Sequence, residues 1–278
     1  MIVTSVFNWP VLLIIIGAFL LNLFFKYCCM RCNSNVCLVG KTAVVTGGSL
    51  GIGHEIVLSL LSRGCKVIVA DKVITENVKK SIIQKTKSSN FVLELVDFAS
   101  FKSVRNFVEK LKKTEAKIDI LVNNVGIGRC GDDPTEDGLN VLMQINYFSP
   151  FLLTHLLIAS DIFAKKLRKH NIMCNSYHPG LIIRTNIFKE SRKYGTLNIL
   201  DVVGLFLLEV GVFIIGQSPR DASQTAVNVV VSEEYKNVTG EFVGVTSIKP
   251  WGSHDEVLSN KIWNASETLV KLQPNEKL

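Results

Sequence analysis

The chain has 278 residues, of which 47% are hydrophobic and 20% are charged. This composition excludes an intrinsically disordered protein, and the length fits a single domain of the size that enzymes commonly have. The 31 basic and 24 acidic side chains give a net charge of +7, but the basic residues are scattered along the chain and form no stripe. We therefore do not expect nucleic acid to be a partner.

The sequence opens with a run of 24 residues without a charged side chain, from Ile2 to Phe25. As a helix this run spans about 36 Å, more than the roughly 30 Å hydrocarbon core of a bilayer. Lys26 and Arg31 follow the run and no basic residue precedes it, which favours a retained anchor over a cleaved signal peptide and places the rest of the chain in the cytosol. We predict a single-pass anchor over 1–26.

Seven cysteines are present, four of them between positions 28 and 37. Their odd number and cytosolic side argue against a disulfide framework. Palmitoylation of Cys28, Cys29 or Cys32 and plain reduced thiols remain the two alternatives. Cys29 and Cys32 have zinc-like spacing, but no second pair of ligands follows, so we expect no metal site. We assign 27–39 to a cysteine-rich juxtamembrane linker and 40–278 to the folded domain.

The domain begins with a strand, a glycine-rich turn and a helix. The β-branched run Thr42 to Thr46 leads into glycines at 47, 48, 51 and 53, and His54 to Arg63 has helical periodicity. A second apolar strand runs from Lys66 to Asp71, which lies 18 positions after Gly53 (71 − 53). This order predicts a βαβ unit that binds a dinucleotide.

The chemistry of a dinucleotide explains each part of this pattern. Free N–H groups and the dipole at a helix N-terminus favour a pyrophosphate, and glycines let the backbone approach it. A carboxylate at Asp71 can bind both ribose hydroxyls and repel a 2′-phosphate, which favours NAD over NADP, whereas Lys72 beside it opposes that preference. The alternative is a tight turn with a purely structural role.

Strand-like and helix-like segments continue to alternate along the chain. Residues 91–97 and 118–122 read as strands with a helix over 100–113 between them. Such alternation predicts an α/β fold with a doubly wound parallel sheet of the Rossmann type. Further on we predict a helix over 221–231, a strand over 240–245 and a terminal helix over 256–272.

From about Gly40 to Leu272 the motifs resemble the short-chain dehydrogenase/reductase family, and in particular its membrane-anchored, retinol-dehydrogenase-like branch. They are the glycine turn, Asp97 after the third strand, and four further motifs: Asn123-Asn124-Val125-Gly126, Thr135 to Leu139, Gln144 to Thr154 around Asn146, and His178-Pro179-Gly180 with Arg184-Thr185. The resemblance implies an NAD(P)-dependent oxidoreductase of the endoplasmic reticulum membrane. Its substrate would be a lipophilic alcohol or aldehyde, such as a retinoid or steroid.

The resemblance also implies roles for individual residues. Asp97 would meet the adenine, and Asn146 would belong to the catalytic proton relay. The cofactor-binding residues would be Thr46, Gly47, Ser49, Leu50, Gly51, Ile52, Gly53, Asp71, Asp97, Asn123, Asn124, Gly126, Pro179, Gly180 and Thr185.

The family's chemistry also needs a tyrosine with a lysine four residues later, and a serine on the preceding strand. None of the five tyrosines is followed by lysine at that spacing. Between the helix-like segments 150–158 and 161–169 only Ala159 and Ser160 remain, which is too short for a strand, two loops and a helix start. We predict that this segment is missing with one central strand, and that residues 172–177 close up beside strand four.

Three hypotheses follow from the sequence. The first is a membrane-bound dehydrogenase in which another group replaces the tyrosine. The second is a non-catalytic nucleotide-binding or interaction protein, such as a splice form or a diverged copy. The third is an incomplete gene product that folds poorly.

Overall fold

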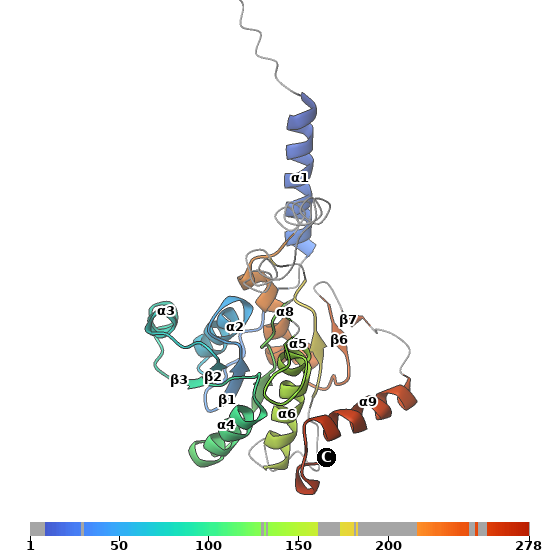
Figure 1. The fold of residues 1–278 in the computed structure, drawn as a ribbon. Helices are drawn as coiled ribbons and strands as arrows, with labels where there is room; N and C mark the ends of the chain where they lie inside the picture. The colour runs from blue at the N-terminus through green and yellow to red at the C-terminus, as the bar shows by residue number, and fades with distance from the viewer. Residues whose placement is uncertain are drawn as a thin grey trace, which may run out of the picture.

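The computed structural model describes residues 9–28, 31–128, 131, 133–160, 173–180, 182, 216–244, 248–249 and 255–277. Figure 1 shows a helix, α1 (Trp9–Cys28), that projects from an α/β domain. The domain's first half holds β1 (Thr42–Thr46), α2 (Gly51–Ser62), β2 (Lys66–Asp71), α3 (Glu76–Thr86), β3 (Phe91–Leu95), α4 (Phe101–Thr114) and β4 (Ile120–Val122). The second half holds α5 (Val141–Met143), the π-helical turn η1 (Gln144–Phe148), α6 (Ser149–Ala159), β5 (Ser176–Tyr177), α8 (Pro219–Val231), η4 (Glu233–Tyr235), β6 (Phe242–Val243), β7 (Ile248–Lys249), α9 (Glu256–Leu269) and η5 (Pro274–Glu276).

Four parallel strands form the main sheet in the order β3-β2-β1-β4. The central strand β1 places Val45 opposite Val69 of β2 and Val122 of β4. The Rossmann-type parallel sheet predicted from the sequence is therefore confirmed. The strands β1 and β2 have the predicted bounds, whereas β4 starts two residues later than predicted, at Ile120.

The prediction that residues 172–177 close up beside strand four is wrong. The strand β5 pairs instead with β6, and β6 pairs with β7 in a separate small sheet. The amide of Ser176 donates to Glu241 O and that of His178 to Val243 O, both at 2.9 Å. These bonds engage one edge of β5, and within the described ranges β4 pairs with β1 alone. The split fits the loss of a central strand, which stays a prediction because 161–172 lie outside the described residues.

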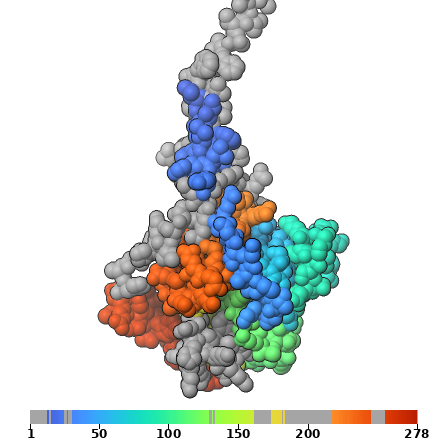
Figure 2. All heavy atoms as spheres, turned by 180° about the vertical axis from the view of Figure 1, so that it is seen from behind, coloured from blue at the N-terminus to red at the C-terminus, as the bar shows by residue number. Residues whose placement is uncertain are grey.

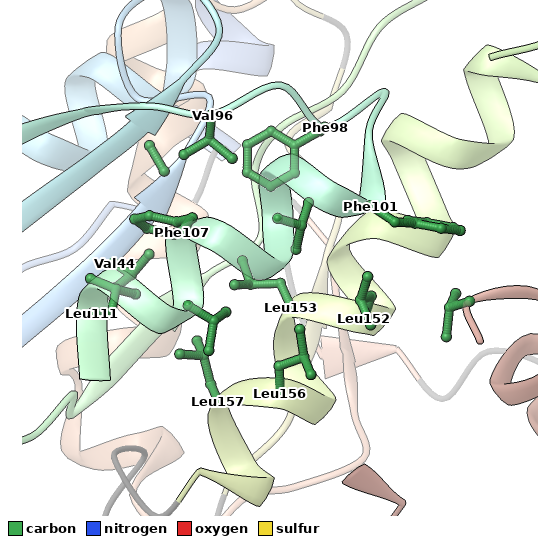
Figure 3. Packing of buried hydrophobic residues seen from close by; sticks show 14 of the residues in the cluster. Val44, Val96, Phe98, Phe101, Phe107, Leu111, Leu152, Leu153, Leu156 and Leu157 are labelled. Carbon is green, nitrogen blue, oxygen red and sulfur yellow. The ribbon is translucent and has the colours of Figure 1, made fainter. Parts of the chain in front are cut away.

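Helices cover both faces of the main sheet and bury its apolar side chains (Figure 1). On one face α4 and α6 enclose the cluster drawn in Figure 3, in which Phe107, Leu152 and Leu153 are at most 4% exposed. On the other face α2 and α8 pack together and bury residues such as Ile56 and Val227. The apolar run Val141–Ala159 is long enough to cross a membrane, but its leucines pack into the core of this domain.

The linker after α1 lies against the domain in an ordered path. Leu38 N donates to Arg63 O at 2.8 Å, and Ser34 Oγ donates to Val231 O at 3.2 Å, at the ends of α2 and α8. Arg63 donates in turn to Ser34 O at 3.1 Å. Figure 2 shows this blue segment beside the orange α8. The helix α1 therefore connects to the domain through a short, hydrogen-bonded segment.

A ring cluster fastens the terminal helix α9 to α6. The imidazole of His155 is 1% exposed and lies between the rings of Phe151 and Trp263, with centroid distances of 4.1 and 4.9 Å. Its Nδ1–H donates to Phe151 O at 3.0 Å, and its Nε2 has no partner among the described residues. Burial lowers the pKa of His155, a shift that the Phe151 carbonyl and Glu267 partly oppose.

This lowered pKa predicts an acid-sensitive fold. Above the ordinary value of 6.5 both folded and unfolded chains hold a neutral imidazole, so stability is full. As the pH falls from 6.5 towards the lower folded pKa, the unfolded chain binds a proton that the fold excludes, and the free energy of unfolding decreases by at most about 1.4 kcal/mol per pH unit for one site.

We expect His155→Phe, which keeps the ring packing, to flatten the fall in stability between pH 7.5 and 5.5 in urea unfolding. Part of the slope should remain, because burial also lowers the pKa of His54. An unchanged slope in the variant would contradict the assignment to His155.

Candidate functional site

The predicted site residues gather where the parallel strands end. Thr46 ends β1 and Asp71 ends β2, while Asn123 directly follows β4. Because β1, β2 and β4 run parallel in one sheet, their carboxyl ends meet along the same edge of the sheet, and α2 begins there as well. Ligands of open α/β sheets bind at this edge.

The glycine turn between β1 and α2 has a geometry that side chains would disrupt. Gly47 and Gly51 have φ angles of +66° and +60°, in the left-handed region that favours glycine. A Cβ on Gly53 would lie 2.2 Å from Gly47 O and 2.4 Å from Asn124 Nδ2. Only glycine at position 53 lets α2 start this close to the turn.

Asn124 holds the turn in place from the neighbouring strand. Its Nδ2 donates to Thr46 O at 3.0 Å and to Gly47 O at 3.1 Å. The hydroxyl of Thr46 accepts from Asn124 N and Val125 N, both at 3.0 Å. These four bonds tie the end of β1 to the segment after β4, so the turn is fixed before any ligand arrives. We call this assembly, Thr46 to Gly53 with Asn124, the cradle.

Three charged side chains lie at the β2 side of the cradle. The carboxylate of Asp71 accepts from Ser49 N at 3.0 Å and from Lys72 N at 2.7 Å. The ammonium of Lys72 pairs with Asp97 at 2.9 Å. Asp97 also accepts from Ala99 N at 2.9 Å. The sequence predicted both carboxylates here but not the ion pair between positions 72 and 97.

The cradle fits a dinucleotide pyrophosphate on three observations. The hydroxyl of Ser49 is buried and has no hydrogen-bond partner in the described part of the chain. No atom lies within 4 Å of the place where a Cβ of Gly51 would be, and no side chain caps α2 at Leu50. Amides at a helix N-terminus with a free hydroxyl are donors suited to phosphate oxygens. The Ile52 amide belongs to the same first turn.

At the β4 side, Asn146 closes a loop with Ile127. Its Oδ1 accepts from Ile127 N at 2.8 Å and its Nδ2 donates to Ile127 O at 2.9 Å. A Cβ on Gly126 would lie 3.6 Å from this Oδ1. Asn146 sits in the π-helical turn η1, which the helical periodicity of the sequence did not reveal. Such turns often occur at functional sites.

The other predicted residues occupy the neighbouring loops. Asn123 Nδ2 donates to Thr154 Oγ1 at 3.1 Å, which connects β4 to α6. After β5, Gly180 N donates to the exposed His178 Nδ1 at 3.0 Å, around Pro179. Thr185 lies outside the described residues.

One described tyrosine, Tyr177, lies at the cradle. Tyr177 OH lies 3.5 Å from Asn124 Oδ1, at the limit of a hydrogen bond. Burial raises the pKa of Tyr177 to about 12, the opposite of what a tyrosine that exchanges protons requires. Tyr147 OH contacts Ser266 Oγ at 3.0 Å in the packing between α6 and α9.

The fold and the cradle define a Rossmann-type α/β protein. The sequence model described as short chain dehydrogenase matches residues 41–162. Retinol dehydrogenase 13 of Mus musculus is 29% identical over 87% of this chain and 87% of its own length. Retinol dehydrogenase 12 of Homo sapiens is 34% identical over 58% of this chain and 52% of its own length.

A solved structure shows the same fold. L-sorbose reductase from Gluconobacter frateurii, crystallised with NADPH and L-sorbose, superposes with a TM-score of 0.59 at 20% identity, over 76% of this chain and 97% of that one. Over residues 41–162 the chain matches the short-chain dehydrogenase family model, and over most of its length it is similar to retinol dehydrogenases. These matches confirm the family resemblance predicted from the motifs, and they support an NAD(P)-dependent oxidoreductase.

Proposed function

We propose that the protein binds a nicotinamide dinucleotide in the cradle and, as an oxidoreductase, interconverts a lipophilic alcohol and its carbonyl compound. The observation that carries the proposal is the preformed turn. Asn124 holds it by hydrogen bonds, and the missing side chains of Gly51 and Gly53 leave room for a ligand and for the close approach of α2. The amides of the α2 start and the Ser49 hydroxyl would hold the pyrophosphate. When bound, the nicotinamide would supply or accept the hydride.

The acid after β2 supports NAD as the preferred form. Both oxygens of Asp71 accept backbone amides, so the carboxylate is held beside the turn and can bind ribose hydroxyls. The same charge repels a 2′-phosphate. Asp97 would lie against the adenine, as the family resemblance implies.

The helix α1 supports a single-pass anchor and an apolar substrate. Most of its described side chains are exposed and apolar, among them Leu13, Phe19 and Phe24 at 61–64%. A helix of 20 residues has the length to cross a bilayer. We propose that the domain faces the cytosol on the endoplasmic reticulum and that a lipid-like alcohol or aldehyde reaches it from the membrane. Retinol dehydrogenases are similar chains named for such a substrate.

A second function, cofactor binding without turnover, is favoured by two observations. No tyrosine in the sequence has a lysine four residues later, and burial raises the pKa of Tyr177, the tyrosine that touches the cradle. Asn146, which the family resemblance assigns to the catalytic proton relay, would then lack the tyrosine that donates the proton.

Turnover and binding measurements on the full chain in lipid nanodiscs separate the two functions. NADH and NADPH fluorescence titrations measure binding, and retinal reduction followed by NAD(P)H absorbance measures turnover. Binding with turnover supports the oxidoreductase. Binding without turnover, over a panel of retinoid and steroid carbonyls, supports the second function, and lack of binding of either cofactor contradicts both.

A further inference from the structure

The charges beside Asp71 carry an inference that rests on the proposed function and deepens it. Lys72 follows Asp71 directly, yet its ammonium pairs with Asp97, which follows the neighbouring strand β3, at 2.9 Å. Only the backbone amide of Lys72 bonds to Asp71. The carboxylates of Asp71 and Asp97 and the ammonium of Lys72 therefore meet at the carboxyl ends of the strands, and the ammonium pairs with Asp97.

We propose that the Lys72–Asp97 ion pair determines the choice between NAD and NADP. A 2′-phosphate on the adenosine ribose would lie near Asp71 and would need an opposing cation. Lys72 is the adjacent cation, but Asp97 neutralises its charge. While the pair holds, a 2′-phosphate meets the negative Asp71 and gains little from Lys72.

The surroundings strengthen this assignment. The carboxylate of Asp71 is fixed by two backbone amides, so it cannot swing towards Lys72 without losing the bond from Ser49 N. The side chains of Lys72 and Asp97 are 64% and 38% exposed, respectively, so their ion pair is weak. Removal of the charge on Asp97 should therefore release the ammonium of Lys72. The ammonium of Lys85, in the last turn of α3, lies 3.6 Å from Glu55 of α2 and is also paired.

The proposal predicts a gain of NADPH binding when the acid loses its charge. In Asp97→Asn the amide oxygen can still accept from Ala99 N, while Lys72 is released to meet a 2′-phosphate. We expect the ratio of the NADPH and NADH dissociation constants to shift by about fivefold in favour of NADPH, the upper range for an exposed ion pair. Because both cofactors share the adenine, the ratio cancels any loss of adenine contact.

The test measures dissociation constants of NADH and NADPH by fluorescence titration of the full chain in detergent micelles. Lys72→Gln alone should change the ratio by less than about twofold, and the double variant should lose the gain of Asp97→Asn. Glu109→Gln, which breaks the exposed pair with Lys112 on α4, is the matched control and should leave the ratio unchanged. Asp97→Ser provides a second neutral variant in case Asp97→Asn binds neither cofactor.

An unchanged ratio in the neutral variants, with NADH still bound, overturns the inference alone. A severalfold loss of NADPH binding in Lys72→Gln also overturns it, because Lys72 would then bind the phosphate despite Asp97. If the unmodified chain binds neither cofactor, the proposed function fails and the inference fails with it.

Discussion

Replacing Gly53 with alanine is expected to abolish dinucleotide binding and to lower the melting temperature by several degrees. The new Cβ would lie 2.2 Å from Gly47 O and 2.4 Å from Asn124 Nδ2, distances that require α2 or the turn to move. Overpacking of this kind costs about 1–3 kcal/mol. Moving the turn also displaces the amides that would face the pyrophosphate. Thermal unfolding and NADH titration of the full chain measure the two effects.

Gly126→Ala is the matched control for the fold. Its Cβ would lie 3.6 Å from Asn146 Oδ1, an ordinary contact distance, so the melting temperature should stay within about 2 °C of the unmodified chain. A Gly53→Ala variant that still binds NADH with unchanged affinity would contradict the geometry of the cradle.

The second large effect is expected at Asn124. In Asn124→Ala the carbonyl oxygens of Thr46 and Gly47 lose the donors at 3.0 and 3.1 Å. A buried acceptor left without its donor costs about 1–3 kcal/mol. The turn would then no longer be fixed to the segment after β4, and we expect NADH affinity to fall by about tenfold, with a lower melting temperature.

Asn106→Ala provides the comparison for this variant. Asn106 is exposed on α4 and is not part of the cradle, so its replacement should alter neither NADH affinity nor melting. Equal effects of the two asparagine substitutions would show that Asn124 does not support the cradle.

The first βαβ unit could be predicted from the sequence because its signals are local. The β-branched run before Gly47, the glycine spacing and the acid at Asp71 fix strand, turn and helix within 30 residues. The strands β1 and β2 have the predicted bounds, and α2 starts three residues earlier, at Gly51, because the amide of His54 already donates to Leu50 O at 3.3 Å.

Features that depend on distant residues could not be predicted in this way. The strand β5 pairs with β6 because Glu241 and Val243, more than 60 residues away, accept its amides. The pair of Lys72 and Asp97 likewise depends on how β2 and β3 end side by side. The π-helical turn around Asn146 inserts into a run whose apolar periodicity is that of an ordinary helix.

Retention of the cradle and the predicted loss of the tyrosine–lysine segment have separate physical consequences. The cradle depends on β1, β2, β4 and α2, all joined in one sheet or packed on it. The predicted missing segment would lie on the side of β4 that faces away from β1. Within the described ranges no strand pairs with β4 on that side. A chain of this kind can bind a dinucleotide while its proton-transfer chemistry is changed or lost.

The most direct test is thermal unfolding of the full chain in detergent micelles over a series of NADH and NADPH concentrations. A ligand that binds the native state raises its stability with the logarithm of ligand concentration. We predict one cooperative transition whose midpoint rises with NADH in the unmodified chain and does not rise in Gly53→Ala. A midpoint that is independent of both cofactors up to millimolar concentration would contradict the cradle as a dinucleotide site.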